Sequence, residues 1–171
     1  MTIQPSSETP QEPPDLLAAI DLGSNSFHMV VARVVQGEIR IMEKLGEKVQ
    51  LASGLGTDNL ITEAAQQRAL ECLQRFAERI QGMPPNAVQI VGTNTLRLAR
   101  NTREFIRRAE AVIGYPIEVI NGREEARLVY LGVAHTLSDD VGRRLVVDIG
   151  GGSTEFIIGE RFETRALESM H

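Results

Sequence analysis

The sequence has very little of what marks secreted, disulfide-bonded or membrane-spanning proteins. Its single cysteine, Cys72, cannot form an internal disulfide and lies in a helical pattern, where it fits a small apolar residue. The apolar runs are far shorter than the roughly 20 residues that a membrane-spanning helix requires. No basic stretch followed by an apolar segment opens the chain, so no secretory signal is visible. We therefore expect a cytoplasmic protein with no transmembrane segment.

An excess of positive charge is also absent, and histidine and cysteine are few. The formal net charge is −5, so we expect no nucleic-acid partner, and a polyanion would have to be bound by a local basic patch. The histidines His28, His135 and His171 are scattered and no Cys-x-x-Cys pair occurs, which argues against a zinc site. A Walker A sequence and a G-x-S-x-G elbow are both absent. The 171 residues, 42% of them hydrophobic, suffice for one domain with a core, or for one domain and part of another.

The most distinctive stretch of the chain is residues 145–158, which read LVVDIGGGSTEFII. The short apolar runs at its two ends predict two strands, and the three glycines between them leave backbone N–H groups uncovered. Such a nest of N–H groups suits an oxyanion, most commonly phosphate. Asp148 and Glu155 bracket the loop, as a hydrated Mg²⁺ beside phosphate would require. The phosphate-binding candidates of this loop are Gly150, Gly151, Gly152, Ser153 and Thr154.

A second stretch, residues 17–31, repeats this pattern and reads LAAIDLGSNSFHMVV. Overlaid on the first, it places Asp21 on Asp148 and His28 on Glu155. Two strand–loop–strand units of this kind could face each other and hold one phosphorylated ligand between them, although either one alone could be an ordinary hairpin with a polar turn. The phosphate-binding candidates of this second loop are Gly23, Ser24, Asn25 and Ser26.

The rest of the sequence predicts an α/β fold with a mixed sheet. Residues 1–14 have the composition of a disordered tail. Strands are expected at 16–21, 27–35, 38–45, 88–92 and 117–120, with a loop or flap at 46–59. Helices are expected at 62–81, capped by Thr62, at 101–114, capped by Asn101 or Thr102, and at 124–137; Asn101 and Glu104 match a capping box. This order, βββαβαβα, continues into a polar connector at 138–142, the second strand–loop–strand unit and a strand at 161–167.

Two acids open the helix expected at 124–137, and their roles depend on where that helix is capped. With Asn121 as the N-cap, Glu124 occupies the third helical position and closes a capping box, which leaves Glu125 without a structural role. With Gly122 as the cap, the roles reverse. Acids in a first turn often serve only the helix dipole, yet a helix start after a sheet strand is also a common place for site residues.

A polar segment, residues 93–97, directly follows the strand expected at 88–92. Its hydroxyl groups, with Arg97 one turn on, could grip a phosphate, or could form an ordinary helix cap with a solvated arginine. We take Thr93 and Arg97 as phosphate-binding candidates. Arginines recur at three- and four-residue steps from Arg97 to Arg107, and on one continuous helix they would form a basic stripe, which is either a solvated face or a site for a long polyphosphate chain.

Four motifs stand in order along the chain: DLGSNS at 21–26, GTNTLR at 92–97, GREEAR at 122–127 and DIGGGSTE at 148–155. Together they resemble the exopolyphosphatase / guanosine pentaphosphate phosphohydrolase family, within the actin-like (ribonuclease H-like) superfamily. The similarity runs from about Leu17 to the end of the chain. The second motif departs from the commoner Ala-Thr-Ser-Ala pattern but keeps Thr93 and Arg97.

The resemblance implies an actin-like domain at 15–138 and, at 139–171, a connector and the first strands of a second such domain, so we expect an N-terminal fragment. It implies Mg²⁺-dependent removal of the terminal phosphate from inorganic polyphosphate and, in many members, from pppGpp to give ppGpp. It places the catalytic carboxylate on Glu125 and puts Asp148 and Glu155 near the metal, with Asp21 as their counterpart in the first loop. We expect these acids to hold Mg²⁺ mostly through water.

Two other functions remain open at this point, namely a phosphotransferase of the same superfamily and a non-catalytic phosphate-binding or self-associating module. The Glu124-Glu125 pair favours hydrolysis over transfer to an acceptor. The strands within 145–167 lack a complete sheet, and a lone hairpin is marginal in water. We expect this segment to pair with a second copy, giving a homodimer in which the two loops of one chain lie apart and the chain alone is inactive.

Overall fold

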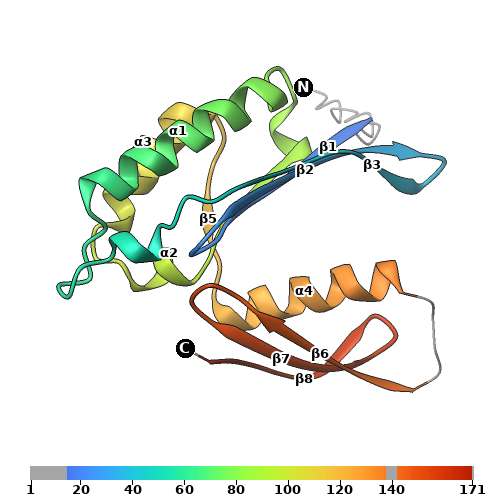
Figure 1. The fold of residues 1–171 in the computed structure, drawn as a ribbon. Coiled ribbons are helices and arrows are strands. Elements are labelled where there is room, and N and C mark those ends of the chain that lie inside the picture. Colours follow the sequence, from blue (N-terminus) through green and yellow to red (C-terminus); the bar gives the residue numbers. More distant parts are fainter. Residues whose placement is uncertain (1–14, 138–141, 171) are drawn as a thin grey trace, which may run out of the picture.

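The computed structural model describes residues 15–137 and 142–170 of the chain. They form a five-stranded and a three-stranded β-sheet, and one helix, α4, lies between the two sheets in the view of Figure 1. The predicted α/β class with a mixed sheet is confirmed. The tail predicted at 1–14 and the domain boundary predicted at 138/139 lie outside the described residues.

The larger sheet has the strand order β3-β2-β1-β4-β5. Its central strand β1 (Leu16–Leu22) pairs antiparallel with β2 (Phe27–Val35) and parallel with β4 (Val88–Gly92). The edge strands are β3 (Glu38–Glu47), antiparallel to β2, and the short β5 (Glu118–Val119), parallel to β4. The ends of β1 and β4 lie side by side, so the polar segments that follow these strands meet at one edge of the sheet.

Two helices, α1 (Glu63–Ile80) and α3 (Thr102–Ile113), cover one face of this sheet (Figure 1). Alternate residues of β1 face the helices, and Ile20 and Leu22 are almost completely buried, whereas Asp21 points to the opposite face. Phe76 of α1 and Phe105 of α3 complete the core with no exposed surface. Burial of each such side chain stabilises the folded state by roughly 1.5–3 kcal/mol. This packing holds in place the sheet whose edge carries the polar segments.

Both helices begin where the sequence predicts, but their capping residues use their side chains differently. Thr62 and Asn101 occupy the N-cap positions, yet neither side chain bonds to its own helix. The Asn101 amide instead binds the backbone of Ile61, accepting from its N–H at 2.9 Å and donating to its C=O at 3.0 Å. The capping box predicted for Asn101 and Glu104 is therefore wrong, because a tertiary contact occupies the asparagine side chain.

Several predicted boundaries change. β3 continues to Glu47, and short 3₁₀ helices occupy Ala52–Gly54 (η1) and Pro85–Ala87 (η2). An additional helix, α2 (Asn94–Leu98), ends before Ala99, so the arginines from Arg97 to Arg107 do not lie on one helix, and the condition for a continuous basic stripe is not met. No helix in the described part of the chain is long and apolar enough to cross a membrane.

The smaller sheet consists of β6 (Arg143–Ile149), β7 (Thr154–Glu160) and β8 (Glu163–Met170), all antiparallel. The helix α4 (Gly122–Thr136) packs on one face of it, with Ala126 and Tyr130 against Ile157. The Tyr130 ring fills the space beside Gly159, where an added Cβ would come within 2.1–2.5 Å of ring atoms, and its hydroxyl donates to the Arg161 C=O at 3.0 Å. This sheet therefore packs within its own chain.

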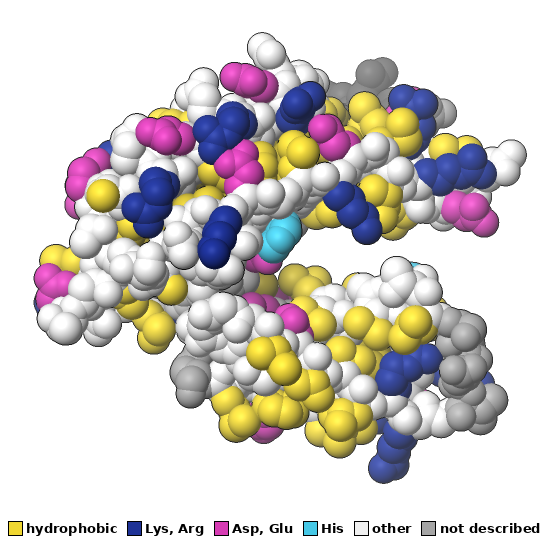
Figure 2. All heavy atoms as spheres, viewed as in Figure 1, with side chains coloured by type: hydrophobic (Ala, Val, Ile, Leu, Met, Phe, Trp, Pro, Cys, Tyr) yellow, Lys and Arg dark blue, Asp and Glu magenta, His cyan; other side chains and the backbone are white. Residues whose placement is uncertain are grey.

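The opposite face of the smaller sheet is apolar and exposed. On β6, Leu145 is 64% exposed and Ile149 80% exposed, and Leu145 lies across from Ile158 of β7. Hydrophobic side chains gather on the lower lobe in Figure 2. Ile158 and Phe162 are also exposed, whereas Phe156 is half-buried.

Candidate active site

A cavity of about 380 Å³ lies between the two sheets, and Figure 2 shows the hollow between the two lobes. Polar residues of both strand–loop–strand units line it, together with Glu125 of α4. The predicted site residues that it brings together are Asp21, Gly23, Ser24, Asn25, Ser26, Thr93, Glu125, Asp148, Gly150, Gly151, Gly152 and Ser153. The predicted residues that do not line it are Arg97, Thr154 and Glu155.

The two strand–loop–strand units have the same local geometry, as their overlay predicts. In each, the acid one residue before the end of the first strand stands opposite the overlaid residue of the second strand, Asp21 opposite His28 and Asp148 opposite Glu155. In each, the first glycine lies over a serine carbonyl, and the Gly150 N–H donates to the Ser153 C=O at 2.9 Å. The repeat read from the sequence is therefore a structural repeat.

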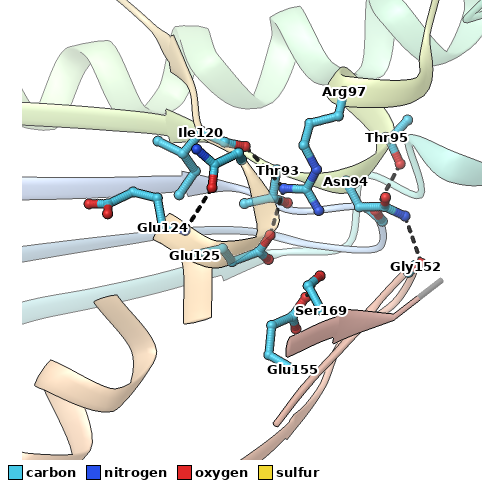
Figure 3. Close-up of polar contacts among 12 residues, drawn as sticks. Thr93, Asn94, Thr95, Arg97, Ile120, Glu124, Glu125, Gly152, Glu155 and Ser169 are labelled. Atoms are coloured by element: carbon cyan, nitrogen blue, oxygen red, sulfur yellow. Dashed lines mark hydrogen bonds and ion pairs between the residues drawn. The ribbon is translucent and has the colours of Figure 1, made fainter. Parts of the chain in front are cut away.

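The two loops face each other within one chain. A Cβ added to Gly151 would lie 2.7 Å from the Cβ of Asn25, and one added to Gly152 would lie 2.7 Å from the Ser24 hydroxyl. The Asn94 amide donates to the Gly152 C=O at 2.6 Å and so links the second loop to α2 (Figure 3). The expectation that the loops lie apart in a single chain is wrong, since α4 holds the smaller sheet against its own chain.

The segment that follows β4 contacts the first loop and the end of β1. The Thr95 hydroxyl donates to the Ser24 hydroxyl at 2.8 Å, and the Thr93 hydroxyl lies 3.5 Å from the Leu22 C=O. Asn94 and His28 also line the cavity and were not among the predicted site residues. Asn94 lies inside the GTNTLR motif, which could have indicated it. The overlay of the two stretches places His28 on the metal candidate Glu155 but gives His28 no role of its own.

The two acids at the start of α4 have different surroundings. The Asn121 side chain accepts from the Glu124 N–H at 2.9 Å, which confirms Asn121 as the N-cap. The Glu124 carboxylate does not close a capping box but pairs with Arg127 at 2.8 Å on the surface. Glu125 points the other way, towards Arg97, whose Nη1 donates to its Oε2 at 2.7 Å (Figure 3).

The Glu125–Arg97 pair is largely buried, with each side chain 16% exposed. Arg97 is fixed further by donation from Nη1 to the Ile120 C=O at 3.1 Å, while its Nη2 is buried without a partner among the described residues. Burial raises the pKa of Glu125, the hydrogen bond from Arg97 opposes this, and repulsion by Glu155 and Asp21 adds to the rise. A carboxylate whose pKa is raised in this way is better suited to accept a proton near neutral pH.

Three further carboxylates crowd the same region. Burial raises the pKa of Asp21, with a smaller rise from the charge of Asp148, although His28 opposes it. Burial, and then repulsion by Glu155, raises the pKa of Asp148. Oxygen atoms Oδ1 of Asp21 and Oε2 of Glu155 are buried without a hydrogen-bond partner among the described residues. Buried anionic oxygens without partners call for a cation.

These acids fit the Mg²⁺ that the resemblance implies, provided that water supplies much of the coordination. Within residues 15–137 and 142–170 there is no group of three His, Cys, Asp or Glu side chains placed to hold a metal ion directly. Mg²⁺ commonly keeps several waters and takes one or two carboxylates. Asp21, Asp148 and Glu155 therefore suit a hydrated ion more than a directly coordinated one.

Replacing Asp21 by asparagine is expected to raise the melting temperature of the chain in the absence of Mg²⁺. The pKa of Asp21 is raised in the folded state, so the folded state binds its proton more strongly than the unfolded state, and ionisation at neutral pH costs stability. The gain should be full at pH 7 and shrink as the pH falls below the raised pKa, where wild-type Asp21 is protonated. Thermal melts at several pH values measure it, and an asparagine variant that melts below wild type at pH 7 contradicts it.

Comparisons with known proteins show which family the sequence matches. A family model described as the Ppx/GppA phosphatase family matches residues 30–171. The "Guanosine-5'-triphosphate,3'-diphosphate pyrophosphatase" of Vibrio cholerae is 56% identical over 155 residues, covering 91% of this chain and 31% of that protein. The protein of the same name from Aliivibrio fischeri is 54% identical over 157 residues, covering 92% and 31%. The chain thus spans about a third of the length of these relatives.

Solved structures confirm the fold. The PPX-GPPA enzyme of Aquifex aeolicus superposes with a TM-score of 0.81 at 31% identity, covering 92% of this chain and 52% of that one. An exopolyphosphatase from Cytophaga hutchinsonii superposes with a TM-score of 0.85 at 32% identity, covering 91% and 50%. The actin-like α/β architecture predicted from the motifs is the architecture of these proteins.

Proposed function

The chain belongs to the Ppx/GppA phosphatase family, and from this premise we propose that the protein carrying it hydrolyses the terminal phosphoanhydride bond of a polyphosphorylated substrate. The observation that carries the proposal is the convergence of both loops and of Glu125, which Arg97 holds by a hydrogen bond, on one cavity. Phosphoryl transfer depends mainly on positioning and on neutralising charge, and these groups are suited to both.

Each group has a distinct proposed role. Backbone N–H groups of the loops at 23–26 and 150–153, with Nη2 of Arg97, would bind phosphoryl oxygens. Glu125 would orient a water molecule in line with the terminal phosphorus and accept a proton from that water. The bond between the terminal phosphorus and the bridging oxygen breaks, and the shortened phosphate chain leaves with that oxygen. Asp21, Asp148 and Glu155 would hold hydrated Mg²⁺, which, when bound, supplies positive charge to the phosphoryl oxygens. Arg97 would keep Glu125 ionised and aimed.

We propose pppGpp as the first substrate and inorganic polyphosphate as the second. The resemblance read from the motifs implies polyphosphate and, in many members, pppGpp, and leaves the preference between them open. The relatives named as pyrophosphatases of guanosine 5′-triphosphate 3′-diphosphate are 54–56% identical, whereas the exopolyphosphatase structure is 32% identical. The higher identity supports the nucleotide, and both substrates present the same terminal phosphoanhydride to the cavity.

Phosphate release by the intact protein, with each substrate in turn and no acceptor present, tests the proposal. We expect Mg²⁺-dependent release of orthophosphate from pppGpp, and a slower release from polyphosphate. No release without an acceptor, together with transfer of the phosphoryl group to acetate or a sugar when one is added, would instead identify a phosphotransferase. Tight phosphate binding without turnover by the intact protein would identify a binding module.

We also propose self-association through the exposed face of the smaller sheet, defined by Leu145, Ile149 and Ile158. A contiguous apolar surface of this kind marks an interaction site or an association hazard. Sedimentation of the 171-residue chain should show a dimer that Leu145→Lys weakens, while Ile39→Lys, on the other lobe and 69% exposed, leaves it unchanged. A wild-type monomer at all concentrations contradicts this proposal.

Two smaller expectations remain proposals. The two loops face each other within one chain, so their separation does not account for the predicted inactivity of the chain alone. Phosphate release by the 171-residue chain would test that inactivity. A cytoplasmic setting is supported by the single buried cysteine, Cys72.

A further inference from the structure

Ser169 on β8 contacts one of the metal-binding candidates. Its hydroxyl donates to Oε1 of Glu155 at 2.8 Å, and the two residues stand directly opposite each other on neighbouring strands (Figure 3). Glu155 is 1% exposed, and its second oxygen, Oε2, is buried without a partner among the described residues. Oε1 is thus held by a neutral donor, whereas the negative charge on Oε2 is not compensated by any described residue.

The same serine touches the helix that carries Glu125. A Cβ added to Gly122, the first residue of α4, would lie 2.5 Å from the Ser169 hydroxyl oxygen and 2.6 Å from its Cβ. Such a contact is too short for any residue larger than glycine at position 122. The glycine that opens the GREEAR motif is therefore explained by the close approach of β8, and it sits three residues before Glu125.

We propose that Ser169 is a positioning residue that holds Glu155 against the start of α4, so that Oε2 faces the hydrated cation beside Glu125. This inference rests on the proposed function, since it concerns the metal held at that site. The charge of Glu155 raises the pKa of both Glu125 and Asp148, which agrees with its lying within reach of both. Groups that orient metal ligands in this way commonly change metal affinity by about 10- to 100-fold when removed.

Mn²⁺ binding to the 171-residue chain, followed by electron paramagnetic resonance in the presence of orthophosphate, tests the proposal without any turnover. Ser169→Ala should weaken Mn²⁺ binding by about 10-fold or more. Ser169→Thr, which keeps the hydroxyl in a strand, should restore binding to near wild type. Thr164→Ala removes a hydroxyl from the same strand at a residue paired with Gly159, away from the cavity, and should leave binding unchanged.

Gly122→Ala supplies an independent arm, because it displaces Ser169 without removing its hydroxyl. It should also weaken Mn²⁺ binding, and circular dichroism establishes that each variant is folded. Folded Ser169→Ala that binds Mn²⁺ as tightly as wild type would overturn the proposal, as would a Thr variant no better than Ala. In the intact protein, Ser169→Ala should raise the Mg²⁺ concentration for half-maximal rate. If the wild-type intact protein releases no phosphate, the proposed function fails, while the Mn²⁺ measurement still decides the role of Ser169.

Discussion

Replacing Glu125 by glutamine is expected to lower the rate of phosphate release by the intact protein by roughly two to four orders of magnitude, the range typical of a lost general base. The amide keeps the size of the side chain but cannot accept a proton from the attacking water. Substrate binding should change much less, because the loops at 23–26 and 150–153 would still hold the phosphate. The loss should therefore appear in kcat and not in KM.

The neighbouring acid provides a matched control. Glu124 has the same side chain at the preceding position, but its carboxylate lies on the surface and pairs with Arg127. Glu124→Gln should leave kcat within a few-fold of wild type and cost no more than about 0.5 kcal/mol of stability. Near-normal turnover of the Glu125→Gln protein, or equal losses in both variants, would show that the carboxylate has been assigned wrongly.

Gly152→Ala is expected to reduce activity by about 100-fold or more. Its Cβ would lie 2.6 Å from the Asn94 amide nitrogen and 2.7 Å from the Ser24 hydroxyl, so the two loops would have to move apart. A displacement of about 1 Å in a group that positions a reacting centre can cost about this much. Initial rates at saturating substrate, with melting temperatures alongside, measure the effect.

Gly132→Ala is the control for this second prediction. Gly132 lies inside α4, and nothing stands within 4 Å of an added Cβ. Alanine is favoured over glycine in a helix interior by roughly 0.5–1 kcal/mol, so this variant should be slightly more stable and fully active. Full activity of the Gly152→Ala protein would mean that the loops do not have to approach each other during the reaction.

The sequence alone predicted the parts of the fold that depend on local periodicity. The first two strands and the helix starts at Thr62 and Asn101 were found within a residue or two. The capping box at Asn101 failed because its amide binds Ile61, 40 positions earlier, which no local pattern can reveal. The strand predicted at 117–120 is only Glu118–Val119, because it pairs with β4 alone.

The packing of the smaller sheet was misjudged for a related reason. The sequence predicts strands within 145–167 without a supporting element, yet α4 offers Ala126, Tyr130 and Ala134 as one apolar face to them. The sequence showed those residues as part of a helix but not which sheet they would cover. The loops face each other because of this contact, which therefore decides whether one chain contains the site.

The candidate site was predicted where motifs carry it, and missed where tertiary contacts carry it. Glu125 followed from the capping argument together with the family resemblance, and Asn121 is the cap on which that argument depends. The pairing of Glu125 with Arg97, 28 positions earlier, could not be read from either motif. Ser169 has no motif of its own and becomes visible only through its contact with Glu155.

A crystal structure of the chain with orthophosphate and Mg²⁺ tests the central claim most directly, namely that the two loops form one phosphate site served by Glu125. We predict phosphate between the loops at 23–26 and 150–153, within hydrogen-bonding distance of Arg97 Nη2. The metal should lie beside Asp21, Asp148 and Glu155, mostly through water, and a water on Glu125 should approach the phosphorus. Phosphate bound to one loop only, or bound elsewhere with Glu125 still enclosed by Arg97, would contradict the account.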